Sequence, residues 1–170
     1  MKKFLEFAGL CALGLAIVGF ILMMATPAVA AMNGNNVSYL PAVEALFGTE
    51  NSQALWPGLV SWILVLVALV GGIVIFVLPL LKIDLFGKMS DLVSLILCGL
   101  LVVAGVLLFF ESAAYQAALN DATSGWGGAI ASTLGVTYAV GAGWIVGGIL
   151  LICAGAVAGL PAILRLVGKK

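Results

Sequence analysis

This 170-residue chain has no histidine and only isolated cysteines. Without histidine, the sequence supplies neither an imidazole metal ligand nor an imidazole general base. Cys11, Cys98 and Cys153 each lie in a different apolar stretch, which argues against a disulfide framework and a paired-thiol redox site. No nucleophile–base pair, metal-ligand cluster or phosphate-binding loop is visible. The sequence therefore predicts a protein that is not an enzyme and uses no cofactor.

Charge is scarce as well. Only 8% of the residues are charged and 64% are hydrophobic, whereas soluble domains average roughly 25% charged residues. The few basic residues do not form a cluster of the kind that binds nucleic acid. This composition predicts an integral membrane protein whose main partner is the lipid bilayer.

Four uncharged stretches are long enough to span a membrane. Residues 129–164 are again uncharged and would be about 54 Å long as one helix, more than a hydrocarbon core of about 30 Å, so this stretch must divide into a covering segment and a span. The predicted fold is an all-α integral membrane protein, an antiparallel up-and-down bundle of four transmembrane helices. The expected spans are residues 4–31, 58–81, 92–110 and 137–164, with outer loops 32–57 and 111–136 and an inner hairpin 82–91.

The basic and the aromatic residues fall on opposite sides of these spans. All seven Lys and Arg residues lie on one side, and all seven Trp and Tyr residues lie on the other. Basic residues near membrane ends stay in the cytoplasm, and amphipathic rings settle at the lipid–water boundary. We therefore expect a plasma (inner) membrane protein with both termini in the cytoplasm. Residues 1–30 also match a secretory signal peptide, and cleavage after Ala30 would leave the orientation of the other spans unchanged.

A short amphipathic helix is predicted in the first outer loop, at residues 41–48. Proline in its first turn and Gly48 at its end are helix boundary signals. Leu40, Val43, Leu46 and Phe47 share one face at helical spacing. This apolar face is expected either to lie on lipid, to cap the bundle, or to dock a partner.

Small residues recur along the fourth span at the spacings that allow close helix packing. They serve either two neighbouring helices of the same chain, or one neighbour and a second subunit or membrane partner. The candidate packing residues are Gly141, Gly143, Gly147, Gly148, Gly155 and Gly159.

Ionisable residues inside a membrane protein often mark a transport path or a proton relay, and this chain has almost none. Glu111, at the outer end of the third span, and Tyr115, one turn further on, are the best candidates for contact with a ligand or an ion. The alternative for Glu111 is a carboxylate that is simply solvated at the membrane boundary.

The order of the segments resembles that of the claudin-type four-span proteins: short cytoplasmic ends, a long first outer loop, a short inner hairpin and a second outer loop. Residues Leu55-Trp56-Pro57-Gly58-Leu59 precede the second span, where that family carries a Trp-Gly-Leu-Trp element together with two cysteines. The first outer loop of this chain has no cysteine. The resemblance thus implies a topology and no residue role.

Two functional hypotheses follow. The first is a non-enzymatic structural, scaffolding or accessory protein that works through helix packing and the apolar face of the first outer loop. The second is a small channel or transporter subunit for an apolar or weakly polar solute, with the fourth span lining the contact between subunits.

Overall fold

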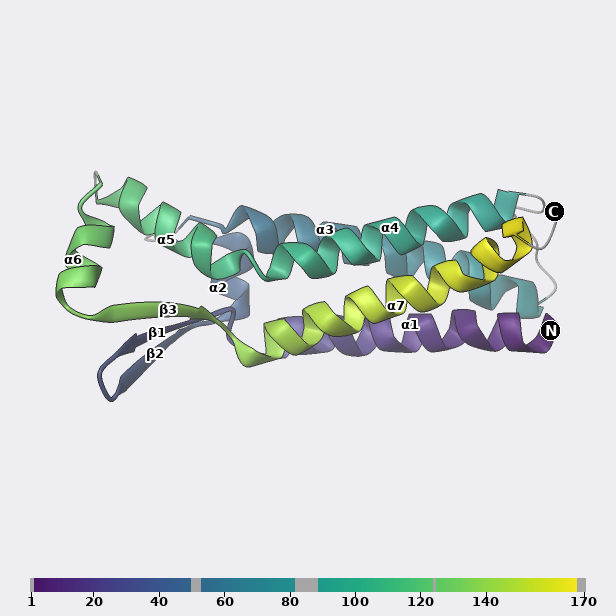
Figure 1. Cartoon of the computed structure of the whole chain (residues 1–170), viewed down its shortest axis with the longest axis horizontal. Helices are drawn as coiled ribbons and strands as arrows, with labels where there is room; N and C mark the ends of the chain where they lie inside the picture. Colours follow the sequence, from purple (N-terminus) through teal and green to yellow (C-terminus); the bar gives the residue numbers. More distant parts are fainter. Residues whose placement is uncertain (1, 50–52, 82–88, 124, 168–170) are drawn as a thin grey trace.

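Four long helices dominate the computed structural model, which describes residues 2–49, 53–81, 89–123 and 125–167. Each is long and apolar enough to cross a membrane, and the structure is mostly helical. The helices lie side by side along an elongated molecule, and α1 begins at the end where α7 finishes (Figure 1). Their bounds are α1 (Lys2–Ala25), α3 (Trp56–Gly72), α4 (Ser90–Leu108) and α7 (Ala142–Val167).

A three-stranded sheet corrects the expectation of an all-α chain. Its order is β2-β1-β3, and both pairings are antiparallel. A turn with Gly34 at φ 58° joins β1 to β2, a left-handed conformation that glycine adopts without strain. β3 arrives from much later in the chain and pairs with the other edge of β1. The strands are β1 (Val29–Asn33), β2 (Asn36–Leu40) and β3 (Val136–Val140).

The strands shorten two of the predicted spans. α1 ends at Ala25, and Thr26 lies immediately before Pro27, a position where helical backbone is disfavoured. Residues 29–31, expected at the end of the first span, belong to β1. Residues 137–140, expected at the start of the fourth span, belong to β3, and α7 starts only at Ala142.

α3 changes its helical geometry near its end. After Gly72 it continues as a π-helical turn (Ile73–Val77) and then as a 3-10 turn (Leu78–Leu81). Pro79 explains the change, because it has no N–H to donate and its ring clashes with the carbonyl four residues earlier in a regular α-helix.

Three short helices complete the structure. α2 forms where the sequence predicts a short helix, and α6 lies within the expected covering segment before the fourth span. α5 follows α4 after a break at residues 109–110, so the third long helix starts and ends two residues earlier than the expected span, residues 92–110. The bounds are α2 (Ala42–Phe47), α5 (Glu111–Ala122) and α6 (Gly127–Thr133).

The predicted inner hairpin, residues 82–91, lies mainly outside the described residues. Ser90 is the first residue of α4, and Met89 occupies the capping position.

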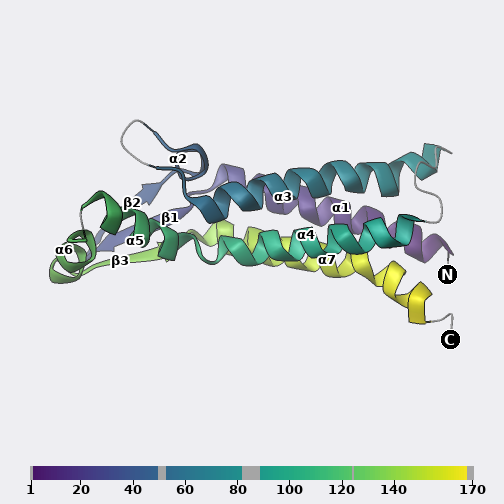
Figure 2. The same ribbon diagram turned by 90° about the horizontal axis from the view of Figure 1, so that it is seen from above.

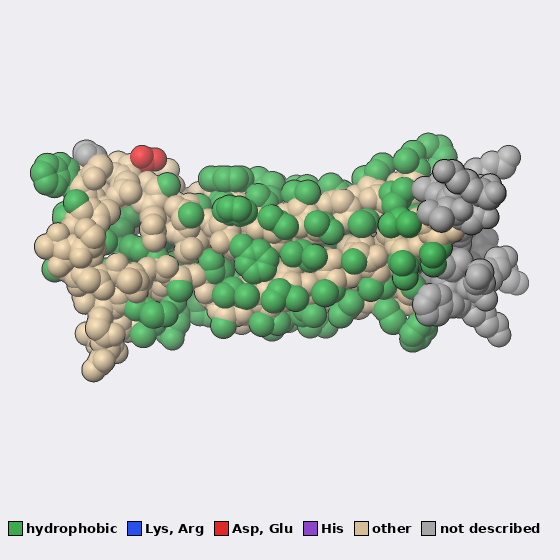
Figure 3. Space-filling view, viewed as in Figure 1, with side chains coloured by type: hydrophobic (Ala, Val, Ile, Leu, Met, Phe, Trp, Pro, Cys, Tyr) green, Lys and Arg blue, Asp and Glu red, His purple; other side chains and the backbone are tan. Residues whose placement is uncertain are grey.

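The bundle and the short elements occupy different parts of the molecule. α2, α5, α6 and the sheet gather at one end, which we call the platform (Figures 1 and 2). Hydrophobic side chains cover the middle of the molecule, over the long helices (Figure 3). α7 packs mainly against α1 and α4, and α3 packs against α4. Two buried hydroxyl groups join helices: Ser61 Oγ donates to the Ala104 carbonyl at 2.9 Å, and Ser94 Oγ donates to the Ala158 carbonyl at 2.7 Å.

Candidate functional site

Glu111 lies at the junction between the bundle and the platform, and it is completely buried. It is the first residue of α5 and faces the first turn of α3, where a methyl group on Gly58 would lie 2.8 Å from Glu111 Oε1. The same methyl group would lie 3.0 Å from the ring of Trp144, the third residue of α7. Three helices therefore meet around one carboxyl group. The structure excludes a solvated carboxylate at this position.

The environment of Glu111 favours its neutral form. Neither carboxyl oxygen has a hydrogen-bond partner of normal geometry among the described residues. Burial raises the pKa of Glu111 from 4.5 to about 8, and the backbone N–H of Gly58 offsets part of that rise. This N–H, in the first turn of α3, acts on the carboxyl electrostatically rather than through a well-formed hydrogen bond. Glu111 is therefore mainly protonated at neutral pH.

Trp144 ties α7 to the end of α1 beside this carboxyl group. Its ring is fully buried, and its Nε1–H donates to the carbonyl oxygen of Thr26 at 3.2 Å. The backbone N–H of Gly141 donates to the carbonyl oxygen of Ala28 at 2.8 Å. These bonds hold the start of α7 against the segment that joins α1 to β1.

Tyr115 lies one turn after Glu111 on α5 and contacts the sheet. Its ring meets that of Tyr138, on β3, edge to face, with centroids 5.3 Å apart and planes 62° apart. Burial, followed by the neighbouring Tyr115, raises the pKa of Tyr138, so this phenol stays neutral over the physiological range.

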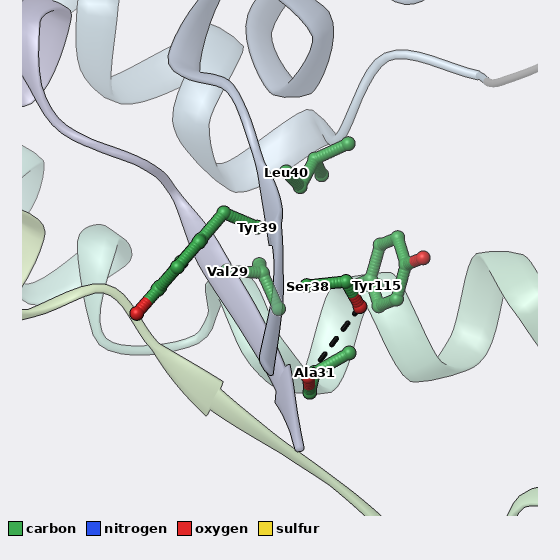
Figure 4. Close-up of a pocket in the computed structure, with 6 residues that line it drawn as sticks. All are labelled: Val29, Ala31, Ser38, Tyr39, Leu40 and Tyr115. Atoms are coloured by element: carbon green, nitrogen blue, oxygen red, sulfur yellow. Dashed lines mark hydrogen bonds between the residues drawn. The ribbon is translucent and has the colours of Figure 1, made fainter. Parts of the chain in front are cut away.

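Tyr115 also borders a pocket of about 150 Å³ on the sheet. Figure 4 shows Ser38 and Tyr115 on one side of the strands, whereas the ring of Tyr39 points the other way. Ser38 Oγ donates to the carbonyl oxygen of Ala31 at 3.4 Å. The pocket is lined by Val29, Ala31, Ser38, Tyr39, Leu40 and Tyr115.

The lining combines the apolar side chains of β1 and β2 with three hydroxyl-bearing residues, two of them aromatic, which suits an apolar group with few polar atoms. The structure thus brings two predicted site residues, Leu40 and Tyr115, into one pocket. Glu111 is not part of that lining and lies instead at the junction between the bundle and the platform.

The residues of the predicted apolar face of the short helix differ in their exposure. Leu46 is buried, but Val43 is 57% exposed and Phe47 is 53% exposed. Ala42 and Ala45 are buried with Leu46. Phe47 is nevertheless in edge-on contact with Trp62 of α3, with centroids 5.4 Å apart.

Gly141, just before α7, and Gly143, in its first turn, lie against the segment that follows α1. A methyl group on Gly141 would collide with the carbonyl of Pro27, and one on Gly143 would collide with the side chain of Thr26. Both positions therefore require the smallest residue for the observed contact.

Glycines further along α7 face two different helices. A methyl group on Gly147 would lie 3.1 Å from the carbonyl oxygen of Gly19 in α1. On α4, Cys98 is the neighbour: its carbonyl oxygen would lie 2.8 Å from a methyl group on Gly155, and its Sγ 2.9 Å from one on Gly159. α7 thus makes close contacts with α1 and with α4.

One exposed feature of the platform escaped the sequence analysis. Trp126, Ile130 and Leu134 are 69%, 52% and 60% exposed and follow each other at intervals of four residues. Ile130 lies in α6, and Trp126 and Leu134 cap its two ends. That spacing places them on one face of the helix, which we call the α6 stripe. The sequence carried this signal, but it lay within the uncharged run that leads into the fourth span.

Comparisons with protein-family models, curated proteins and solved structures find no match for this chain. Among the described residues, no group of three or more His, Cys, Asp and Glu side chains is placed to hold a metal ion. Evidence for the function therefore comes from the platform and the packing of the helices.

Proposed function

We propose that this chain is a small, non-enzymatic, multi-pass membrane protein that organises or assists a membrane complex. The four long helices form an up-and-down bundle in the plasma (inner) membrane, with both termini in the cytoplasm. The platform then lies on the outer side, where it engages a partner.

The α6 stripe is the observation that carries this proposal. Trp126, Ile130 and Leu134 are more than half exposed, yet they lie in or directly beside a short helix outside the spanning helices. α6 lies at the far end of the platform, beyond α5, so the stripe is remote from the bundle (Figure 1). Contiguous apolar surface in such a position typically marks a protein interaction site.

The packing of α7 supports a structural role for the bundle. Its glycines contact α1 and α4 of the same chain, which leaves them engaged without a second subunit. A void lined by residues of α1, α3, α4 and α7 measures only about 10 Å³, space for roughly one water molecule. These contacts favour a packed scaffold over a solute route through one chain.

Photo-crosslinking from α6 in native membranes tests the proposal. A photo-reactive residue in place of Ser132, which is exposed on α6, is expected to form a protein adduct. Because apolar contact drives the association, the double substitution Trp126→Ser and Ile130→Ser should abolish that adduct, whereas Thr133→Ala on the same helix should leave it intact.

An adduct that is unchanged by the double substitution, or an adduct formed with lipid alone, contradicts the proposal. Solute flux in proteoliposomes that a bulky substitution at Gly148 alters would favour the channel or transporter hypothesis instead.

A further inference from the structure

The outer edge of β2 is open for pairing. Among the described residues, β1 is its only strand neighbour. Residues 36–39 are exposed along this edge, and Leu40 is half-buried. Edge strands are usually protected from pairing by charged residues or by proline within the strand, and Asn36–Leu40 contains neither. Pro41 follows directly and limits the edge to five residues.

The pocket lies beside this edge. Its lining residues come from β1, β2 and α5, so it is placed toward the β2 side of the sheet. Ser38 and Leu40 are two residues apart in β2, so their side chains lie on the same face of the strand, and both border the pocket. A cavity of about 150 Å³ is large enough for a benzene ring. A strand that paired with β2 could therefore place one of its alternate side chains in the pocket.

Charge indicates which kind of strand fits. Glu44 and Asp121 are charged residues of the platform, and the sequence has no Lys or Arg between residues 4 and 81 or between 89 and 164. A neutral or basic segment complements this surface, whereas a second copy of the chain would bring the same acidic charge.

We propose that the platform binds an extended, neutral or basic segment of a partner protein, which adds to the edge of β2 and inserts one aromatic or branched apolar side chain between Ser38, Leu40 and Tyr115. Main-chain hydrogen bonds to β2 supply the affinity, and the pocket selects the inserted side chain. The inference rests on the proposed function of the platform as a recognition surface, and it adds a second contact to the α6 stripe.

Peptide selection on the intact protein tests this inference. The full chain in lipid nanodiscs is used to select binders from a displayed library of random short peptides, and binding of the enriched peptides is measured by fluorescence anisotropy. Ser38→Leu fills the pocket, and Val37→Leu is the matched control on the opposite face of the same strand. Thermal unfolding of both variants checks that each retains the fold.

We expect the enriched peptides to carry an aromatic or branched apolar residue, to lose about tenfold or more in affinity for Ser38→Leu, and to keep their affinity for Val37→Leu. Bound peptide should also slow hydrogen exchange at the backbone amides of β2. Equal binding to all three proteins, or no enriched peptide, overturns the inference.

A disulfide-linked dimer of Ser38→Cys, with no peptide enriched, would assign the edge to a second copy and also overturn it. Neither result affects the α6 crosslinking, which tests the proposed function separately.

Discussion

Gly105 of α4 and Gly148 of α7 bring their backbones into direct contact. A methyl group on Gly105 would lie 2.6 Å from the carbonyl oxygen of Gly148, and one on Gly148 would lie 2.9 Å from the carbonyl oxygen of Gly105. Lipid provides little hydrophobic drive for two apolar helices to associate, so such close packing contributes much of their attraction. The contact between α4 and α7 therefore depends on glycine at both positions.

Gly105→Ala is expected to destabilise the fold by about 1–3 kcal/mol, because the backbone of α7 must move to admit the methyl group. Gly99→Ala is the matched control in the same helix, since a methyl group there meets nothing within 4 Å. This control should be neutral or stabilising by up to about 1 kcal/mol, because alanine favours the helix. Thermal unfolding in detergent measures both variants, and equal effects would contradict the predicted contact.

Ser94→Ala should weaken the same helix pair by a smaller amount. The Ser94 hydroxyl is buried and donates to the carbonyl of Ala158 at 2.7 Å. Hydrogen bonds between membrane helices average about 0.6 kcal/mol, so a loss near that value is expected in unfolding measurements. Ser132→Ala, which removes an exposed bond within α6, should cost almost nothing. A Ser94 variant as stable as the Ser132 variant would rule out a stabilising role for the bond.

Glu111 should make the protein less stable as the pH rises. The folded state holds the proton up to a pKa of about 8, whereas the unfolded chain releases it near 4.5. Stability therefore falls between these two values, by roughly 3–5 kcal/mol in total. Glu111→Gln keeps the neutral shape, and it should be more stable than the native protein at pH 9 and similar to it at pH 5.

Thermal unfolding across this pH range checks the expectation for Glu111. Asp121→Asn removes an exposed carboxyl from the same helix and should leave the pH dependence in place. Parallel pH profiles for the native protein and Glu111→Gln would show that the buried carboxyl is not responsible.

The proposed orientation predicts which end of the molecule reacts from outside intact cells. In a chain without Cys11, Cys98 and Cys153, a cysteine at Ser132 on the platform should react with a membrane-impermeant maleimide. A cysteine at Met89, near the opposite end, should react only after the membrane is permeabilised. The reason is that basic residues flank that end in the sequence and are retained in the cytoplasm. The reverse labelling pattern would invert the topology.

The helical part of the fold was largely predictable because its signals are local. Long uncharged stretches indicate the spanning helices. The expected first span, residues 4–31, nevertheless runs past Pro27, whereas α1 ends at Ala25. A short apolar run is equally consistent with a helix and with a strand. The apolar residues 29–31 and 137–140 therefore extend the expected helices, although they form strands. Only the pairing of Ala31 with both Ser38 and Tyr138 identifies these residues as a sheet.

The sequence indicates single residues of the candidate site, but it does not indicate which of them lie together. Leu40 and Tyr115 were selected for unrelated reasons, one from an apolar helix face and the other from its place beside an acid. Their common pocket exists because β2 pairs with β1 and α5 lies over the sheet. Similarly, no pattern in the sequence indicates that Glu111 is buried against Gly58 and Trp144.

The sequence by itself determined which stretches are apolar enough to span a membrane. This property follows from the transfer free energies of neighbouring residues. The tertiary structure alone decided that β1 lies between β2 and β3, that α7 packs between α1 and α4, and that Glu111 is shielded from water. These features depend on contacts between residues far apart in the chain, and a single sequence carries no periodic signal for such contacts.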